Sequence, residues 1–160
     1  MNKVLQLISE NARLTNEEIA VMLSMTEEEV ENEIDRLTSE GIIKGYRTLI
    51  NWERSGELRA TALIDLKVQP KKEFGFDDIA RRLNQMPEVE SVYLMSGGYD
   101  ISLTVKGRTM QDIAMFVVKR LSPMDGIIST TTHFVLNRYK DGNVIFDNGE
   151  RPDERRSNLL

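Results

Sequence analysis

The sequence has 160 residues, 40% of them hydrophobic and 29% charged, which is ordinary for a globular protein of one typical or two small domains. It has no cysteine and one histidine, which excludes disulfides, thiolate metal sites and multi-histidine metal sites. No apolar run approaches the roughly 20 residues of a membrane span, which excludes transmembrane helices. A cytoplasmic protein is therefore expected. The net charge is −5, and residues 1–53 carry five bases against eleven acids.

The first third of the chain is predicted to form three helices and a wing. An apolar stripe over residues 4–8 has helical spacing. Two capping boxes of the form T-x-x-E, at Thr15 and Thr26, begin a second and a third helix, and the third ends near Gly41. Two helices a few residues apart are typical of a helix-turn-helix. The β-branched and aromatic stretch IIKGYRTLINWE, residues 42–53, predicts two short strands, a wing.

The rest of the chain predicts a ferredoxin-like βαββαβ domain. Strands are expected at residues 59–68, 89–97, 99–107 and 127–139, and helices at residues 77–86 and 109–122, with a break at Pro70-Lys-Lys and a Gly-Gly turn between the middle strands. This order gives a four-stranded antiparallel sheet with both helices on one face. The open face, expected to carry Val, Leu and Met, predicts dimerisation through this domain.

The tail and the domain limits complete this organisation. One more short strand is expected within residues 143–146, and the last ten residues, which are polar and charged, are predicted to be disordered. We therefore expect the following division: a winged helix-turn-helix domain at 1–53, a linker at 54–58, a βαββαβ oligomerisation domain at 59–140, to which the family resemblance described next adds ligand sensing, and a largely flexible extension at 141–160.

Three phrases in this order resemble the Lrp/AsnC family, the leucine-responsive or feast/famine regulators. They are L-x-x-x-G-I-I-K-G-Y at residues 37–46, S-G-G-Y-D at residues 96–100 and P-x-D-G-I-x-x-T-x-T at residues 123–132. The resemblance covers residues 2–140. It implies an α+β protein in which a winged helix-turn-helix precedes a βαββαβ domain of the RAM type, and it implies a DNA-binding transcription regulator.

The resemblance also implies a small-molecule site. Family members dimerise through the sensing domains, often assemble into octamers, and bind an amino acid or similar metabolite between neighbouring dimers. By this carry-over the ligand is framed by Met95, Gly97, Gly98, Asp100, Thr130 and Thr132. Glycine amides can approach a carboxylate, an aspartate can receive an ammonium group, and threonines offer hydroxyls. The alternative is a plain hairpin turn capped by an aspartate and followed by ordinary strand threonines.

The third predicted helix departs from what DNA binding requires. The stretch TEEEVENEID, residues 26–35, holds six acids and no base, and Glu33 and Thr38 stand where the family usually has arginine and glutamate. The family's opening phrase L-D-x-x-D is also missing. The first three glutamates favour the helix dipole, whereas Glu31, Glu33 and Asp35 are interpreted as a solvated face.

If DNA is bound, the bases available in this domain are Arg13, Arg36, Lys44 and Arg47. We expect DNA affinity that is modest, strongly salt-dependent and weighted to the wing, with avidity in an oligomer compensating for weak single domains.

Two other functions remain open. The acidic helical domain could bind a protein partner while the second domain acts as an oligomeric scaffold. Siroheme decarboxylases share this two-domain build, but their H-N-Y-x-R phrase is absent where VYLMSGG runs, and the single histidine, His133, is expected to be an ordinary strand residue. No nucleophile–base pair, phosphate loop or metal cluster is recognisable, so no catalytic residue, metal or cofactor is expected. Trp52 is interpreted as a buried anchor between wing and linker.

Overall fold

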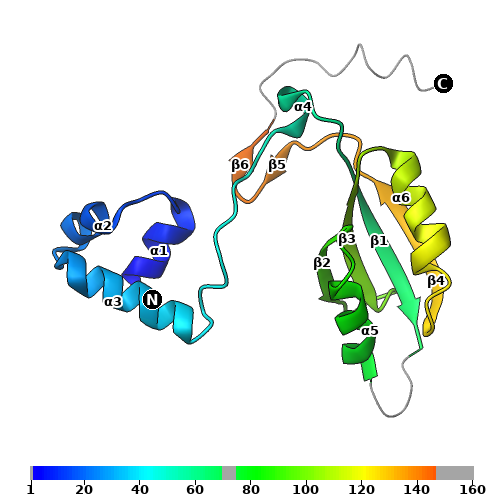
Figure 1. The fold of residues 1–160 in the computed structure, drawn as a ribbon, viewed down its shortest axis with the longest axis horizontal. Coiled ribbons are helices and arrows are strands. Elements are labelled where there is room, and N and C mark those ends of the chain that lie inside the picture. The colour runs from blue at the N-terminus through cyan, green and yellow to red at the C-terminus, as the bar shows by residue number, and fades with distance from the viewer. Residues whose placement is uncertain (1, 70–74, 147–160) are drawn as a thin grey trace. The chain divides into compact units, whose positions relative to one another are not determined.

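The computed structural model describes residues 2–69 and 75–146 of the chain (Figure 1). The chain divides into two compact units, Met1–Thr48 and Leu49–Leu160. The described part of the first unit contains only helices, and that of the second combines helices with a sheet, which confirms the predicted α+β class. Among the described residues, no helix is long and apolar enough to cross a membrane.

The first unit is a three-helix bundle made of α1 (Lys3–Glu10), α2 (Asn16–Leu23) and α3 (Glu27–Ser39). Both predicted capping boxes are confirmed. The Thr15 hydroxyl accepts from the Glu18 amide while the Glu18 carboxylate accepts from the Thr15 amide, and Thr26 and Glu29 repeat this exchange at α3. The small core buries the apolar faces of the three helices around Val4, Ile19, Ala20 and Val30.

The end of α3 has a hydrogen-bonded stop at Gly41. The Ile42 amide donates to the Leu37 carbonyl (2.9 Å) and the Gly41 amide to the Thr38 carbonyl (3.0 Å), the pair of bonds that defines a Schellman motif. Gly41 has φ +70°, a left-handed conformation that side-chain-bearing residues rarely adopt. The sequence therefore places the end of the third helix correctly.

The two wing strands expected over residues 42–53 are not formed. Residues 43–51 lie outside helix and strand, and a helical turn, α4 (Trp52–Ser55), follows them. Two short strands with no third strand beside them are only marginally stable. In addition, the Asn51 side chain accepts a hydrogen bond from the Arg54 amide (3.2 Å), a helix cap that competes with strand geometry.

The second unit contains the predicted ferredoxin-like fold. Its elements in chain order are β1 (Ala60–Val68), α5 (Gly75–Asn84), β2 (Val89–Leu94), β3 (Ile101–Gly107), α6 (Met110–Phe116), the π-helical segment η1 (Val117–Leu121) and β4 (Ile127–Phe134). The strands pair antiparallel in the order β2-β3-β1-β4. Figure 1 shows the green to yellow helices α5 and α6 beside this sheet. The domain core lies between the sheet and these helices, around Ile64, Leu66, Leu103, Leu83 and Ile113.

The open face of the sheet is more polar than expected. Val92 and Leu94 pair with Leu103 and Ile101, and this register places both side chains on the helix side of the sheet, where Val92 packs against the core while Leu94 remains 65% exposed. On the opposite, open face, the residues of β1, β3 and β4 mainly carry hydroxyl groups or charges. They include Thr61, Asp65, Lys67, Ser102, Thr104, Thr131 and His133. Leu63 and Tyr93 are the apolar exceptions and are 46% and 58% exposed.

The last strands of the described chain are those expected from sequence, but β4 is shorter than expected. Strand β4 ends at Phe134 rather than at residue 139, and its pairing with β1 ends at Ala62–Phe134, followed by one hydrogen bond from the Val135 amide to the Thr61 carbonyl (2.9 Å). The expected strand near residue 145 is confirmed as β6 (Val144–Ile145), which pairs with β5 (Lys140–Asp141). The predicted break at residues 70–72 and the predicted disordered tail lie outside the described residues.

Candidate functional site

The outer surface of α3 is anionic. The acids interpreted from sequence as solvated, Glu31 and Asp35, are exposed, as are the first-turn glutamates. Glu29 belongs to the capping box, where its carboxylate accepts from the Thr26 amide (2.7 Å). A helix with this surface offers carboxylates to whatever approaches it, and carboxylates repel phosphates.

The arginine of this helix, Arg36, is held by two carboxylates. Its Nε and Nη2 donate to the two oxygens of Glu33 (2.9 and 2.8 Å), and its Nη1 donates to both oxygens of Glu40 (2.8 Å each). These hydrogen bonds, those of Glu33 first, raise the pKa of Arg36. The guanidinium proposed from sequence as a DNA contact thus has donors on all three nitrogens directed at carboxylates of its own helix.

Glu33 is not the solvated residue that the sequence suggests. Its side chain is 24% exposed, and besides Arg36 it accepts a hydrogen bond from the Asn2 amide group. Asn2 is also the N-cap of α1, where its side-chain oxygen accepts from the Leu5 amide (3.1 Å). Hydrogen bonds from Arg36 and then from Asn2 lower the pKa of Glu33 to about 2. Glu33 therefore links the start of α1 to α3, and the missing family arginine is replaced by a helix-joining carboxylate.

The other three cations proposed from sequence lie outside the helices and are exposed. Arg13 is in the turn between α1 and α2, where its backbone amide donates to the Asn11 side chain (3.0 Å). Lys44 and Arg47 follow α3. The Lys44 ammonium folds back toward Gly41, within 2.8 Å of the position that a Cβ on this glycine would occupy. It thus lies near the negative end of the α3 dipole.

The proposed ligand residues of the second unit converge only in part. Residues 95–100 form the loop between β2 and β3, which is closed by a hydrogen bond from the Met95 amide to the Asp100 carbonyl (2.8 Å). Met95, Gly97 and Gly98 are exposed there. Thr130 and Thr132 pair with Leu66 and Ile64, whose side chains are buried under the helices, so these two threonines occupy the helix-covered side of the sheet.

Asp100 fixes the loop to β1. One carboxylate oxygen accepts from the Val68 amide (2.9 Å) and the other from the Lys67 ammonium (3.2 Å), while the Asp100 amide donates to the Leu66 carbonyl (2.9 Å). The Val68 hydrogen bond and then Lys67 lower the pKa of Asp100. The residue is ionised at neutral pH and holds the loop in place.

Gly97 and Gly98 are not the glycines of a tight hairpin turn. Neither has the positive φ that two-residue hairpin turns require, and a Cβ on either would meet nothing within 4 Å. The fold of this chain alone gives no steric reason for glycine at either position.

Sequence reasoning missed two residues at this loop. The Tyr99 hydroxyl and the Thr131 hydroxyl lie 2.9 Å apart and form a hydrogen bond between the loop and β4. Thr131 pairs with Asp65 on the open face, one residue away from both predicted threonines. Because strand side chains alternate between faces, the sequence already implied that Thr131 lies on the face opposite to Thr130 and Thr132. Only the strand register decides which of these faces meets the loop.

Comparisons with known proteins cover nearly the whole described chain. Residues 2–44 match the family of winged helix-turn-helix DNA-binding domains, and residues 61–145 match the Lrp/AsnC ligand binding domain. The uncharacterised HTH-type transcriptional regulator YugG of Bacillus subtilis is 43% identical over 155 residues, which are 96% of this chain and 92% of that protein.

Solved structures share this fold. A transcriptional regulator from Neisseria meningitidis in complex with L-Met is 27% identical, has a TM-score of 0.72 and is matched over 88% of this chain and 93% of its own. AsnC of E. coli has a TM-score of 0.65 at 23% identity, over 84% of this chain and 89% of its own.

Proposed function

Since the chain belongs to the Lrp/AsnC family of transcription regulators, we propose that its first unit binds DNA and that the loop at residues 95–100 of its second unit binds an amino acid or a similar small metabolite that controls DNA binding. The observation that carries the effector site is the pair Gly97-Gly98, two exposed glycines that the chain's own turn geometry and packing do not require.

Glycines that a fold does not need leave their backbone amides open to an outside group. In this loop they stand next to Asp100, which is ionised and held by Val68 and Lys67. A carboxylate has about four acceptor positions, so Asp100 retains capacity for an ammonium group. An α-amino acid carries both a carboxylate for the amides and an ammonium for the aspartate. The L-Met complex of the Neisseria relative supports this ligand class.

DNA binding by this chain depends on cations outside α3. Arg13, Lys44 and Arg47 are exposed in the turn after α1 and in the segment after α3, whereas the Arg36 guanidinium is bound to Glu33 and Glu40. With so few phosphate contacts, one unit is expected to bind weakly, and assembly of several copies would raise the affinity through avidity. We propose that this assembly is a dimer or a larger ring formed through the second unit.

One experiment tests both parts of the proposal. Fluorescence anisotropy of a labelled duplex from upstream of the protein's own gene is measured at about 50 mM salt, where phosphate contacts are strongest, with each of the common amino acids, L-Met included. We expect at least one amino acid to change the affinity for DNA in the wild type and in Arg108→Gln, a control variant at an exposed position outside the loop. Gly98→Ala, whose Cβ has open space, should fold but lose that response.

The outcomes separate the two parts. DNA binding without any amino-acid response, together with thermal stability that no amino acid changes, would refute the effector site. Absence of binding to every upstream duplex would refute the DNA role and favour a protein partner. One feature supports that second candidate: α2 exposes Val21 and Met22, at 78% and 56%, in the same unit as the acidic α3. For either role we propose no enzymatic activity.

A further inference from the structure

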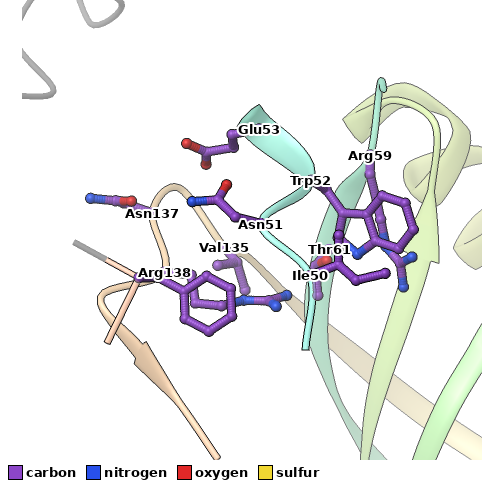
Figure 2. A pocket seen from close by; sticks show the side chains of 10 residues that line it. Ile50, Asn51, Trp52, Glu53, Arg59, Thr61, Val135, Asn137 and Arg138 are labelled. Carbon is purple, nitrogen blue, oxygen red and sulfur yellow. The ribbon is translucent and has the colours of Figure 1, made fainter. Parts of the chain in front are cut away.

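A small pocket lies in the second unit, away from the loop at residues 95–100. Its volume is about 80 Å³. It is lined by the segment that begins this unit, the start of β1, the chain after β4 and the residue after β6: Ile50, Asn51, Trp52, Glu53, Arg59, Thr61, Val135, Asn137, Arg138 and Phe146. Figure 2 shows these side chains from close by. The pocket shares no residue with the effector site proposed above.

One wall holds an arginine stacked on the sequence's single tryptophan. The Arg59 guanidinium lies 4.6 Å from the centre of the Trp52 ring, and its Nη2 donates to Glu90. Within the described residues, the Arg59 Nε–H group is buried and has no hydrogen-bond partner. A buried donor without an acceptor is costly to a fold and indicates that an acceptor can be taken up there. Trp52 itself is half-buried, not the buried anchor expected from sequence.

A second arginine enters the pocket from the opposite wall. The Arg138 guanidinium lies 5.2 Å from the centre of the Phe146 ring, and Figure 2 shows it directed toward Ile50 and Thr61. Its Nη1 is 3.4 Å from an Asp141 oxygen. Because a guanidinium has five N–H donors in a planar fork, this single contact leaves donors for a further group.

The remaining polar groups favour an anion over a cation. Asn51 uses its side-chain oxygen to cap α4, so its amide nitrogen is the atom that faces other groups. The acid in the lining, Glu53, is exposed and extends away from Trp52 and Arg59 in Figure 2. Glu90 is shared between Arg59 and Lys106. Arginine forks beside aromatic rings are suited to a planar carboxylate.

We propose that this pocket binds a small carboxylate, independently of the effector site at residues 95–100. The volume of about 80 Å³ corresponds to two or three times the roughly 30 Å³ share of one water molecule. It accommodates a carboxylate group with one small substituent, the size of acetate. The carboxylate lies between Arg138 and the Nε–H of Arg59, beside the Trp52 ring. Residues 50–53 form part of the wall, so the ligand fixes the chain segment that starts the second unit.

The single tryptophan makes the proposal directly measurable. Intrinsic fluorescence of the full chain, without DNA, is recorded during titration with sodium acetate at constant ionic strength maintained with sodium chloride. The wild type is expected to give a saturable change with acetate and none with chloride alone. Arg138→Gln removes the fork and should raise the half-saturating acetate concentration at least about tenfold, as expected for loss of a charge-assisted pair. Arg138→Lys, which keeps the charge but not the fork, should give an intermediate value.

Two controls fix the interpretation. Arg108→Gln removes an exposed guanidinium of the same unit and should titrate like the wild type. Gly98→Ala, which addresses the other proposed site, should also titrate like the wild type, so that failure of one proposal is distinguishable from failure of the other. Melting curves confirm that each variant is folded. A wild-type response equal to that of chloride, or an unchanged acetate response in folded Arg138→Gln, overturns the proposal.

Discussion

Glu40 restrains the one arginine of α3, and removing it should strengthen DNA binding. In Glu40→Gln the Arg36 Nη1 loses its charged partner, while Nε and Nη2 stay on Glu33. Glu33 must remain because it also accepts from Asn2 and joins α1 to α3. The substitution therefore frees part of one guanidinium without altering the link between the helices.

The magnitude follows from counterion release. One additional phosphate contact steepens the slope of log K against log salt by about 0.9. Over a fourfold increase, from about 50 to about 200 mM salt, this adds roughly a 3.5-fold loss of affinity to that of the wild type. At the lower salt concentration Glu40→Gln should bind the labelled upstream duplex more tightly than the wild type.

The matched control is Glu10→Gln, which removes an exposed acid from the last turn of α1. It changes the net charge of the unit by the same amount without releasing an arginine. Anisotropy titrations at four or five salt concentrations give both slopes. If Glu10→Gln and Glu40→Gln showed the same slope and the same gain, the effect would be general charge, and the reasoning about Arg36 would be wrong.

Two further predictions concern stability. Leu66→Ala, at a fully buried position of β1, should lower the free energy of unfolding by about 2–5 kcal/mol in a urea titration; a loss under about 1 kcal/mol would contradict the assigned core. Asp100 has a lowered pKa in the folded chain, so its contribution to stability is present above the ordinary value of 3.8 and is lost as the pH falls through the folded pKa. Asp100→Asn should be less stable than the wild type at pH 7, and this difference should shrink on acidification below about pH 4. A constant difference from pH 7 to pH 2 would show that ionisation of Asp100 contributes nothing.

Features set by neighbouring residues were predictable from sequence. The capping boxes at Thr15 and Thr26 and the end of α3 at Gly41 each depend on contacts between residues at most five positions apart, so a local pattern is enough to identify them. The order of strands and helices followed for the same reason, from hydrophobic periods that change along the chain.

Features set by distant partners were not predictable. The faces of Val92 and Leu94 depend on their register with β3, and a shift of one residue would have reversed them. The role of Glu33 depends on Asn2, 31 positions earlier. The wing strands failed because the side chain of Asn51 caps a helical turn where pairing was expected. At the loop, the hydrogen bond between Tyr99 and Thr131 forms because β4 pairs with β1. No local sequence motif predicts this pairing.

The acids on the outer surface of α3 bear on how such a protein would search a chromosome. Random DNA attracts proteins through its phosphates alone, and each protein cation that meets one strengthens that attraction. A domain with five bases against eleven acids in its first 53 residues gains little from such encounters. Few copies of the protein would then be held on the large excess of non-operator DNA. Occupancy of the operator depends on the ratio of the affinity for the operator to the affinity for random DNA. Weak binding to random DNA raises this ratio even when the affinity for the operator is only moderate.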